Sequence, residues 1–293
     1  MLDLIYTIIT GVFIGSIYGL IALGFVIINK STGVLNVAQG SLVMIGAFIC
    51  LLFSVQIGVP FFLAVILTLI VSFFLGMLLD RVLFRPMIGQ PHMGVLMMTF
   101  GLLWLLDGMV VFVWGADNYA FPKVLPSAAL FIAGMRFTHE LLWSFIVATV
   151  LMVALLLFFR YSRTGVDMRA VADDQQAAQA AGVPVKFNYS VAWGIGTVVA
   201  SAGGILLGVV TFVFYGLGMI GMKVLPVVIL GGLDSIPGAI IAGILVGVLE
   251  NLAGSYVEPY IKGIKEVAPF FILMIILLIK PHGLFGQERI ERI

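Results

Sequence analysis

Residues 160–186, RYSRTGVDMRAVADDQQAAQAAGVPVK, lie between two long apolar runs in a chain that is otherwise nearly bare of charge. The segment Asp167–Ala181 contains strong helix formers and no proline, so it predicts a helix. Thr164 or Asp167 is expected to cap its start, Gly182 suits the position just past its end, and Pro184 prevents its continuation. The stretch therefore predicts a short, solvated, charged helix between two membrane spans.

Four alanines of this helix are expected to share one face, which a partner could approach closely: Ala170, Ala177, Ala178 and Ala181. The other faces carry charged and amide side chains. Two interpretations are open at this point. The stretch is either an ordinary solvated loop or a docking element for a soluble partner.

Composition places the chain among membrane proteins. Of its 293 residues, 62% are hydrophobic and 10% are charged, and the mean hydropathy is +1.22. A soluble protein has about 25% charged residues. Each membrane span needs about 20 apolar residues, so the sequence predicts an all-α polytopic protein with about eight or nine membrane-embedded helices, some discontinuous. We expect one transmembrane domain over residues 1–293, with residues 160–186 as a cytoplasmic loop within it.

Several function classes are excluded by what the sequence lacks. Cys50 is the only cysteine, which excludes intrachain disulfides and multi-cysteine metal sites. His92, His139 and His282 lie in separate loops, so no metal site is expected. There is no phosphate-binding G-x-x-x-x-G-K-[ST] loop, no basic run for nucleic acid, and no nucleophile near a base. The chain is therefore not expected to be an enzyme, to have catalytic residues or to hold a cofactor.

The apolar runs give the expected order of spans. The N-terminal run follows no Lys or Arg and no clear cleavage site, so it is interpreted as a retained span. Its Gly11, Gly15 and Gly19 form a small-residue stripe that lets a neighbouring helix approach closely. Spans are expected at about 4–28, 38–54, 60–79, 93–114, 141–159, 189–214 and 267–279. Residues 221–254 read as two short apolar pieces broken between Gly231 and Pro237.

Lys and Arg in short loops set the expected orientation. The positions expected to be cytoplasmic are Arg81, Arg85, Arg160, Arg163, Arg169, Lys186, Lys280, Arg289 and Arg292. The loop 115–140 is then outside, and so is the N-terminus if the short second run crosses. The two pieces around Gly232 either both cross or form a re-entrant pair. Parity leaves this open, and we favour two crossings with Leu233–Pro237 near the inner side.

A polar segment stands where the second span should begin. It contains Asn36, Gln39, Gly40 and Ser41, and the run behind it is barely long enough to cross. A discontinuous helix there would present backbone N–H groups to a substrate carboxylate. Alternatively, the amides simply bond to neighbouring helices. The break at Gly231 and Gly232 is a second candidate for a pathway or hinge.

Asp107 is interpreted as the one acid well inside an apolar run, GLLWLLDGMVVFVW. A carboxylate within a membrane is a functional candidate, because its burial is costly. A paired structural residue is the alternative.

Four segments together resemble the permease subunits of ABC importers for branched-chain amino acids and their relatives for urea and amides. They are GSIYGLIALGFVIINKSTGVLNVAQGSLVMIGAF at 15–48, RYSRTGVDMRAVADDQQAAQAAGV at 160–183, VLPVVILGGLDSIPGAIIAGILVGVLEN at 224–251, and KPHGLFG at 280–286. They occur in that family's order and spacing, so the resemblance covers essentially the whole chain.

The resemblance implies that residues 163–182 form a cytoplasmic coupling helix that docks on an ATPase subunit. The positions carried over are Arg163, Gly165, Arg169, Ala170, Asp173, Ala177 and Gly182. It also implies that Asn36–Ser41 lines the substrate path. The implied partners are ATP-binding subunits that hold ATP and magnesium, a second permease, a periplasmic binding protein received by the loop 115–140, and lipid of the bacterial inner membrane.

The expected function is passage of a branched-chain amino acid or a similar small polar or carboxylated solute, driven by a partner ATPase. Asp107 departs from the neutral residue expected at its position and puts a plain branched-chain substrate in doubt. The alternative function is a self-sufficient secondary transporter or channel that uses Asp107. The sequence leaves the solute, the role of Asp107, the number of crossings and the identity of the second permease open.

Overall fold

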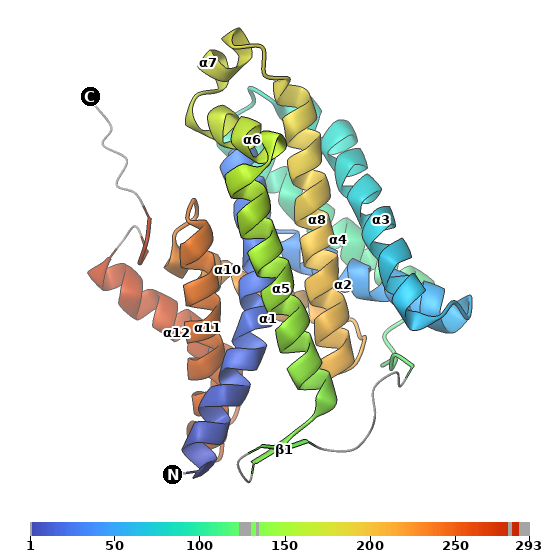
Figure 1. Ribbon diagram of the computed structural model, residues 1–293, viewed down its shortest axis with the longest axis vertical. Helices are drawn as coiled ribbons and strands as arrows, with labels where there is room; N and C mark the ends of the chain where they lie inside the picture. The colour runs from blue at the N-terminus through green and yellow to red at the C-terminus, as the bar shows by residue number, and fades with distance from the viewer. Residues whose placement is uncertain (1, 123–129, 133–134, 281–282, 287–293) are drawn as a thin grey trace.

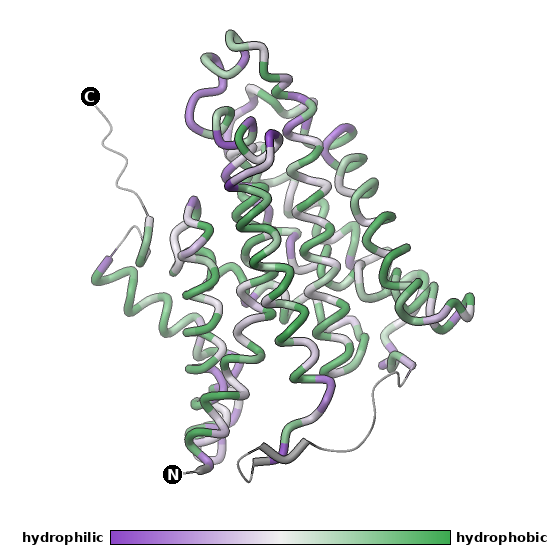
Figure 2. The backbone as a smooth tube through the Cα atoms, in the orientation of Figure 1, coloured by the Kyte–Doolittle hydropathy of each residue, from purple (hydrophilic) through white to green (hydrophobic). Residues whose placement is uncertain are grey.

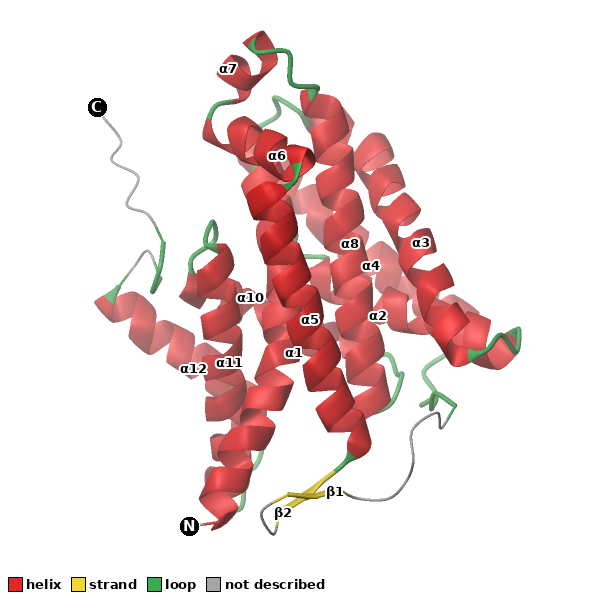
Figure 3. Cartoon of the chain, in the orientation of Figure 1, coloured by secondary structure: helices red, strands yellow, loops and turns green. Residues whose placement is uncertain are grey.

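The computed structural model describes residues 2–122, 130–132, 135–280 and 283–286. It is an assembly of helices with one short antiparallel strand pair, β1 (Leu130–Ile132) and β2 (Met135–Phe137), as Figure 3 shows. In chain order the α-helices are α1 (Leu2–Thr32), α2 (Gln39–Leu51), α3 (Phe61–Leu79), α4 (His92–Trp114), α5 (His139–Tyr161), α6 (Arg163–Asp173), α7 (Gln175–Ala180), α8 (Val185–Val210), α9 (Leu217–Met222), α10 (Val224–Gly231), α11 (Ile236–Leu252) and α12 (Ile264–Ile279).

The prediction of an all-α polytopic membrane protein is confirmed. Seven helical segments in the described ranges are long and apolar enough to cross a membrane, and Leu217–Gly231 is a shorter apolar piece. Helix α12 has 16 residues, most of them Ile, Leu, Phe or Met. Figure 2 shows the consequence: hydrophobic residues dominate the long helices, while hydrophilic ones gather around α6 and α7.

The long helices α1 and α8 form the interior, and α3, α4 and α5 lie outside them. In their most apolar stretches, 83% of the residues of α1 and 78% of those of α8 are buried, whereas the share is 22% in α5 and 28% in α3 and α4. Large apolar side chains on these outer helices are exposed, Phe112 by 91% and Phe62 by 70%. Because no aqueous protein leaves so many such groups in water, these surfaces face lipid.

Helix α1 packs on α11 through glycines, as the stripe in the sequence predicts. A Cβ atom on Gly15 would lie 2.7 Å from the backbone oxygen of Gly243, and one on Gly11 would lie 2.7 Å from the Cα of Val248. The two backbones therefore touch along the contact, which only residues without a side chain permit.

Four of the residues predicted to be cytoplasmic lie in two contacts at the end of the molecule that carries α6 and α7. The Arg85 side chain donates a hydrogen bond to the backbone oxygen of Lys186 at 3.2 Å, and Arg169 donates to that of Arg160 at 3.3 Å. The N-terminus and the strand pair lie at the opposite end (Figure 1). The tail residues Arg289 and Arg292 and the middle of the loop 115–140 lie outside the described residues.

The break near Gly232 exists, and the turn between α10 and α11 lies beside the end of α1. The Asn29 amide donates to the backbone oxygen of Leu233 at 3.2 Å, and the Lys30 ammonium donates to that of Asp234 at 3.3 Å. This places the turn toward the end of the molecule that carries α6, as the favoured topology expects.

A carboxylate organises the turn before α12. Glu258 accepts hydrogen bonds from the backbone N–H groups of Gly263 at 2.8 Å and Lys265 at 3.0 Å. The donors at Lys265 and Gly263 hold the pKa of Glu258 below its ordinary value. The charged carboxylate thus occupies free N–H groups at the start of α12.

The predicted single helix 167–181 is wrong in its bounds and its continuity. Ser162, not Thr164 or Asp167, caps α6 by accepting from the Gly165 N–H. Asp174 has extended backbone and caps α7 by accepting from the N–H groups of Gln176 and Ala177. An aspartate side chain competes with the helix for these donors, which ends one helix and starts the next.

The end of α7 follows the prediction. Gly182 has a φ of +85°, and its N–H bonds the Gln179 oxygen while the N–H of Val183 bonds the Ala178 oxygen. This pair of bonds around a left-handed glycine satisfies the last carbonyls of the helix.

Candidate functional site

The α1–α2 connection is a buried break in the helices, as predicted. Gly33 has a φ of +69°, and α2 begins only at Gln39. Asn36 is completely buried, and its amide donates to Oε1 of Gln39 at 3.1 Å. Asn36 Oδ1 and Gln39 Nε2 are buried without a hydrogen-bond partner among the described residues. Beside the N-terminus of α2, a buried acceptor and a buried donor thus lack a hydrogen-bond partner among the described residues, which is costly.

Two of the predicted pathway residues meet in the structure. The Ser41 hydroxyl donates to Oδ1 of Asp107 at 2.6 Å, and the Tyr215 hydroxyl donates to Oδ2 at 3.5 Å. We call Ser41, Asp107 and Tyr215 the polar cluster. It joins α2, α4 and the segment between α8 and α9. Asp107 is therefore a paired residue, and its partly exposed carboxylate lies beside the first turn of α2.

Gly40 is needed for close packing at this place. A Cβ on it would collide with the backbone oxygen of Gly218 and lie 2.9 Å from the Met222 nitrogen. Helix α9 therefore crosses the first turn of α2 with backbone against backbone. Movement of either helix would move the other, together with the polar cluster.

Gly231 and Gly232 occupy a different site from the polar cluster. Gly232 has a φ of +99°, which favours glycine, and a Cβ on it would lie 2.6 Å from the Gly286 nitrogen. The Leu284 N–H donates to the Leu230 oxygen at 2.7 Å, so residues 283–286 cover the turn. These glycines form a covered turn between α10 and α11.

Residues Arg163–Ala180, the α6–α7 segment, are anchored by side chains. Met168 is 1% exposed and packs with Ile27 of α1, Phe159 of α5 and Val191 of α8. Val171 and Ala178 pack with Val185 and Tyr189 in a second apolar cluster. The segment therefore contacts three membrane-spanning helices at once.

The expected single alanine face does not exist, because the break at Asp174 turns α7 away from the line of α6. Ala178 is buried and Ala170 half-buried, whereas Ala177 and Ala181 are exposed. The side available to a partner consists of charged, amide and small side chains. Its exposed members from the predicted set are Arg163, Asp173, Ala177 and Gly182.

The remaining residues of that set serve the fold. A Cβ on Gly165 would lie 2.6 Å from the Phe158 oxygen, so glycine permits α6 to cross the end of α5. Arg169 is half-buried and bonds the Arg160 oxygen, which ties α6 to α5.

A cavity connects the α6–α7 segment with the break before α2. Its volume is about 430 Å³, and its lining includes Thr32 and Leu35 on one side and Gln175 on the other. The first residue of α7 and the segment that leads to Asn36 thus border the same space.

The sequence interpretation missed a buried ion cluster. Lys223, between α9 and α10, lies 2.8 Å from Glu250 of α11 and 2.6 Å from Glu266 of α12. Lys223 and Glu250 are 6% and 3% exposed, so Asp107 is not the one acid inside an apolar run. The only signal in the sequence was one charged residue, Lys223 or Glu250, in each of the two short apolar pieces. Their pairing depends on how α10 and α11 pack against each other.

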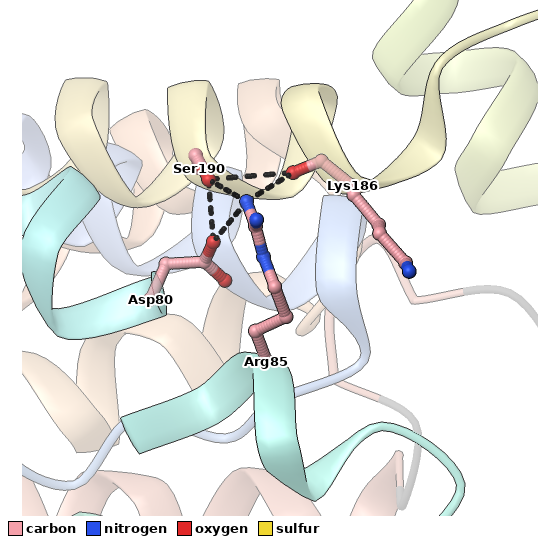
Figure 4. Close-up of polar contacts among 4 residues, drawn as sticks. All are labelled: Asp80, Arg85, Lys186 and Ser190. Carbon is pink, nitrogen blue, oxygen red and sulfur yellow. Dashed lines mark hydrogen bonds and ion pairs between the residues drawn. The ribbon is translucent and has the colours of Figure 1, made fainter. Parts of the chain in front are cut away.

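Asp80 directly follows the span predicted at 60–79, yet it is only 1% exposed. It accepts a hydrogen bond from Ser190 at 2.6 Å and lies 3.5 Å from the Arg85 guanidinium, which also bonds Ser190 at 2.7 Å (Figure 4). A π-helical turn at Asp80–Phe84 continues α3 and carries these charges to α8.

Known proteins resemble the whole chain. A family model described as branched-chain amino acid transport system / permease component matches residues 7–279. The high-affinity branched-chain amino acid transport system permease proteins LivH of Salmonella typhimurium and BraD of Pseudomonas aeruginosa are each 30% identical over 97% of this chain and 96% of their own length. The probable branched-chain amino acid transport permease protein LivH of Methanocaldococcus jannaschii is 26% identical over 92% of this chain and 88% of its own.

Proposed function

The chain belongs to the family of permease components of branched-chain amino acid transport systems, and we propose from this premise that it is the membrane subunit of an ABC importer. It lets a branched-chain amino acid or a similar small carboxylated solute pass across a bacterial inner membrane. ATP hydrolysis, with its magnesium, resides in partner ATP-binding subunits. A second permease and a periplasmic solute-binding protein complete the transporter.

The single observation that carries the proposal is the anchoring of the α6–α7 segment. Its exposed side is free to receive a soluble subunit, while Met168 and Ala178 on its inner side pack against membrane helices. Displacement of the segment would therefore press directly on α1, α5 and α8. This is the arrangement that an importer with a separate motor needs, because the chain has no nucleotide-binding loop of its own.

For the solute, we propose a path beside the α2 break. The N-terminus of α2 and Nε2 of Gln39 offer donors to a carboxylate, and Oδ1 of Asn36 is an open acceptor for an ammonium group. Asp107 supplies negative charge nearby through the polar cluster. An amino acid carries both complementary groups, so the solute class and the polar residues agree.

The alternative function, a secondary transporter that uses Asp107, is not favoured. The family consists of components of multi-subunit transport systems, and Ser41 and Tyr215 already engage both oxygens of Asp107.

Reconstitution tests the proposal. Proteoliposomes that contain this chain, the second permease and the ATP-binding subunits should take up radiolabelled leucine only with ATP and the solute-binding protein. Asp107→Asn should lower this uptake about tenfold or more, while the uptake still depends on ATP. A hydrogen bond to a charged group contributes more than about 1.5 kcal/mol, which corresponds to about a tenfold change. Asp3→Asn, at an exposed position outside the loop 115–140 and the polar cluster, is the control and should have no effect.

Uptake by this chain alone, without ATP and abolished by Asp107→Asn, would overturn the importer and support the secondary transporter. Equal uptake by Asp107→Asn and the parent would remove Asp107 from the path while leaving the importer intact.

A further inference from the structure

A groove with three cationic side chains lies where α3 and α8 meet, at the end of the molecule that carries α6. Its volume is about 720 Å³, and its lining includes Arg81, Arg85 and Lys186 beside Phe74, Leu78 and Phe187. Both the α3 side and the α8 side of the groove thus combine cationic and apolar side chains. None of these six residues belongs to the polar cluster or to the exposed side of the α6–α7 segment.

The positive charge of the groove exceeds what the protein neutralises. Asp80 is engaged by Arg85 and Ser190. Among the described residues, no carboxylate lies within salt-bridge distance of Arg81 or Lys186. Figure 4 shows the Lys186 side chain extending away from the Asp80 network, with its ammonium group at the far end. Two exposed cations therefore remain available for an anion.

The apolar side chains on the α3 side belong to the membrane-facing surface of α3. Phe74 and Leu78 are 63% and 55% exposed, and both lie on a segment that spans the membrane by length and composition. Arg81 follows Phe74 by about two helical turns, or about 10 Å along the axis, and follows Leu78 by about one turn. An apolar surface that leads from the membrane interior to a basic rim matches the shape of a phospholipid, with its acyl chains inside and its headgroup at the interface.

We propose that this groove is a binding site for an anionic phospholipid. The headgroup phosphate contacts the Arg81 guanidinium and the Lys186 ammonium, while the acyl chains lie along Phe74 and Leu78. Arg85 is held by Asp80 and fixes the floor of the site. The lipid would connect the end of α3 to the start of α8, directly after the α6–α7 segment. The proposal does not depend on the transported solute.

Native mass spectrometry of the purified chain tests the site. The protein is incubated with equal amounts of phosphatidylglycerol and phosphatidylcholine that have identical acyl chains. The parent should retain phosphatidylglycerol preferentially. Each of Arg81→Gln and Lys186→Gln should weaken that preference about fivefold, because each basic residue near an anionic surface contributes about that factor. Arg163→Gln is the matched control, an exposed cation at the same end that does not line the groove.

A second measurement locates the lipid. Phosphatidylglycerol with a photoreactive acyl chain should label the peptide that contains Phe74 and Leu78 in the parent, and should label it less in the Arg81→Gln, Lys186→Gln double variant. Unchanged melting temperatures of the variants would show that the fold is intact. Soluble glycerol phosphate should not displace the lipid, because it lacks the acyl chains.

Three results would overturn the proposal. The first is equal retention of the two lipids by the parent. The second is an equal loss of preference in Arg163→Gln and in the two groove variants. The third is that the groove variants weaken the complex with the ATP-binding subunit and leave lipid retention unchanged, which would assign the groove to a protein partner.

Discussion

Helix α1 makes two unlike contacts, one with α11 and one with α6. Along α11, glycines at Gly11 and Gly15 bring backbone atoms together, and no side chain can adjust between the helices. At α6, Met168 and Ile27 meet as flexible side chains in a small apolar cluster. We call the α1–α11 contact the fixed joint, because packed backbone atoms cannot rearrange, and the α1–α6 contact the adjustable contact, because its side chains can. The difference indicates that a displacement imposed from outside the molecule can be accommodated at the α1–α6 contact, where side chains can repack, and not at the α1–α11 contact.

The largest effect is expected at the fixed joint, from Gly247→Leu. A Cβ on Gly247 would collide with the backbone of Gly15, and no rotamer avoids it. We expect a loss of stability beyond about 3 kcal/mol, because overpacking that must displace backbone costs more than overpacking of side chains. The measurement is the yield and thermal unfolding of detergent-purified protein.

Gly108→Leu is the matched control for this substitution. Gly108 lies in α4, and a Cβ there meets no atom within 4 Å. Near-parental yield and melting temperature are expected for it. If Gly247→Leu behaved like this control, the α1–α11 contact would not be a fixed joint.

The next effect is expected from Lys223→Met. It removes the partner of the buried Glu250 and should cost about 3–5 kcal/mol, the usual result of leaving one buried charge unpaired. Because α9 also packs on the first turn of α2, the polar cluster should lose order as well. Thermal unfolding measures the cost. Lys262→Met, at an exposed lysine, should change stability little.

The double variant Lys223→Met, Glu250→Leu sharpens this prediction. It removes both buried charges and should recover most of the stability. Failure of the double variant to recover would mean that Glu266 or the surrounding packing, and not the unpaired Glu250, determines the loss.

The smallest effect is expected next to the adjustable contact, at the start of α7, from Asp174→Ala. Loss of the cap of α7 should destabilise that helix by about 1 kcal/mol, while the membrane helices keep their stability. Hydrogen exchange of the α7 amides should become about fivefold faster, and Asp174→Asn should restore it. Faster exchange in α1 or α11 amides as well would show that the two contacts are not separate.

Much of the fold follows from the sequence, because span length and glycine spacing are local properties. The α1 stripe and the break before Gln39 are both predicted by residues within one or two helical turns. The break at Asp174 was missed because an aspartate favours both a helix surface and a helix cap, and only the packing of Val171 and Ala178 against α8 decides between them.

Contacts between residues that are distant along the chain could not be predicted from the sequence. Ser41 and Asp107 were each proposed separately, and their hydrogen bond depends on how α2 and α4 pack. Lys223 and Glu250 gave still less signal, because each alone resembles a residue at a helix end. The sequence could indicate which residues are costly to bury, but not which of them meet.

Site-directed cross-linking tests the central claim most directly, namely that an ATP-binding subunit docks on the exposed side of the α6–α7 segment. Cys50 is completely buried, so a single exposed cysteine can be introduced by Ala177→Cys, with Thr138→Cys at the opposite end as the control. A thiol-reactive cross-linker should join the ATP-binding subunit to the Ala177→Cys variant and not to the Thr138→Cys variant. Cross-linking at position 138, or none at position 177 in an intact complex, would contradict the claim.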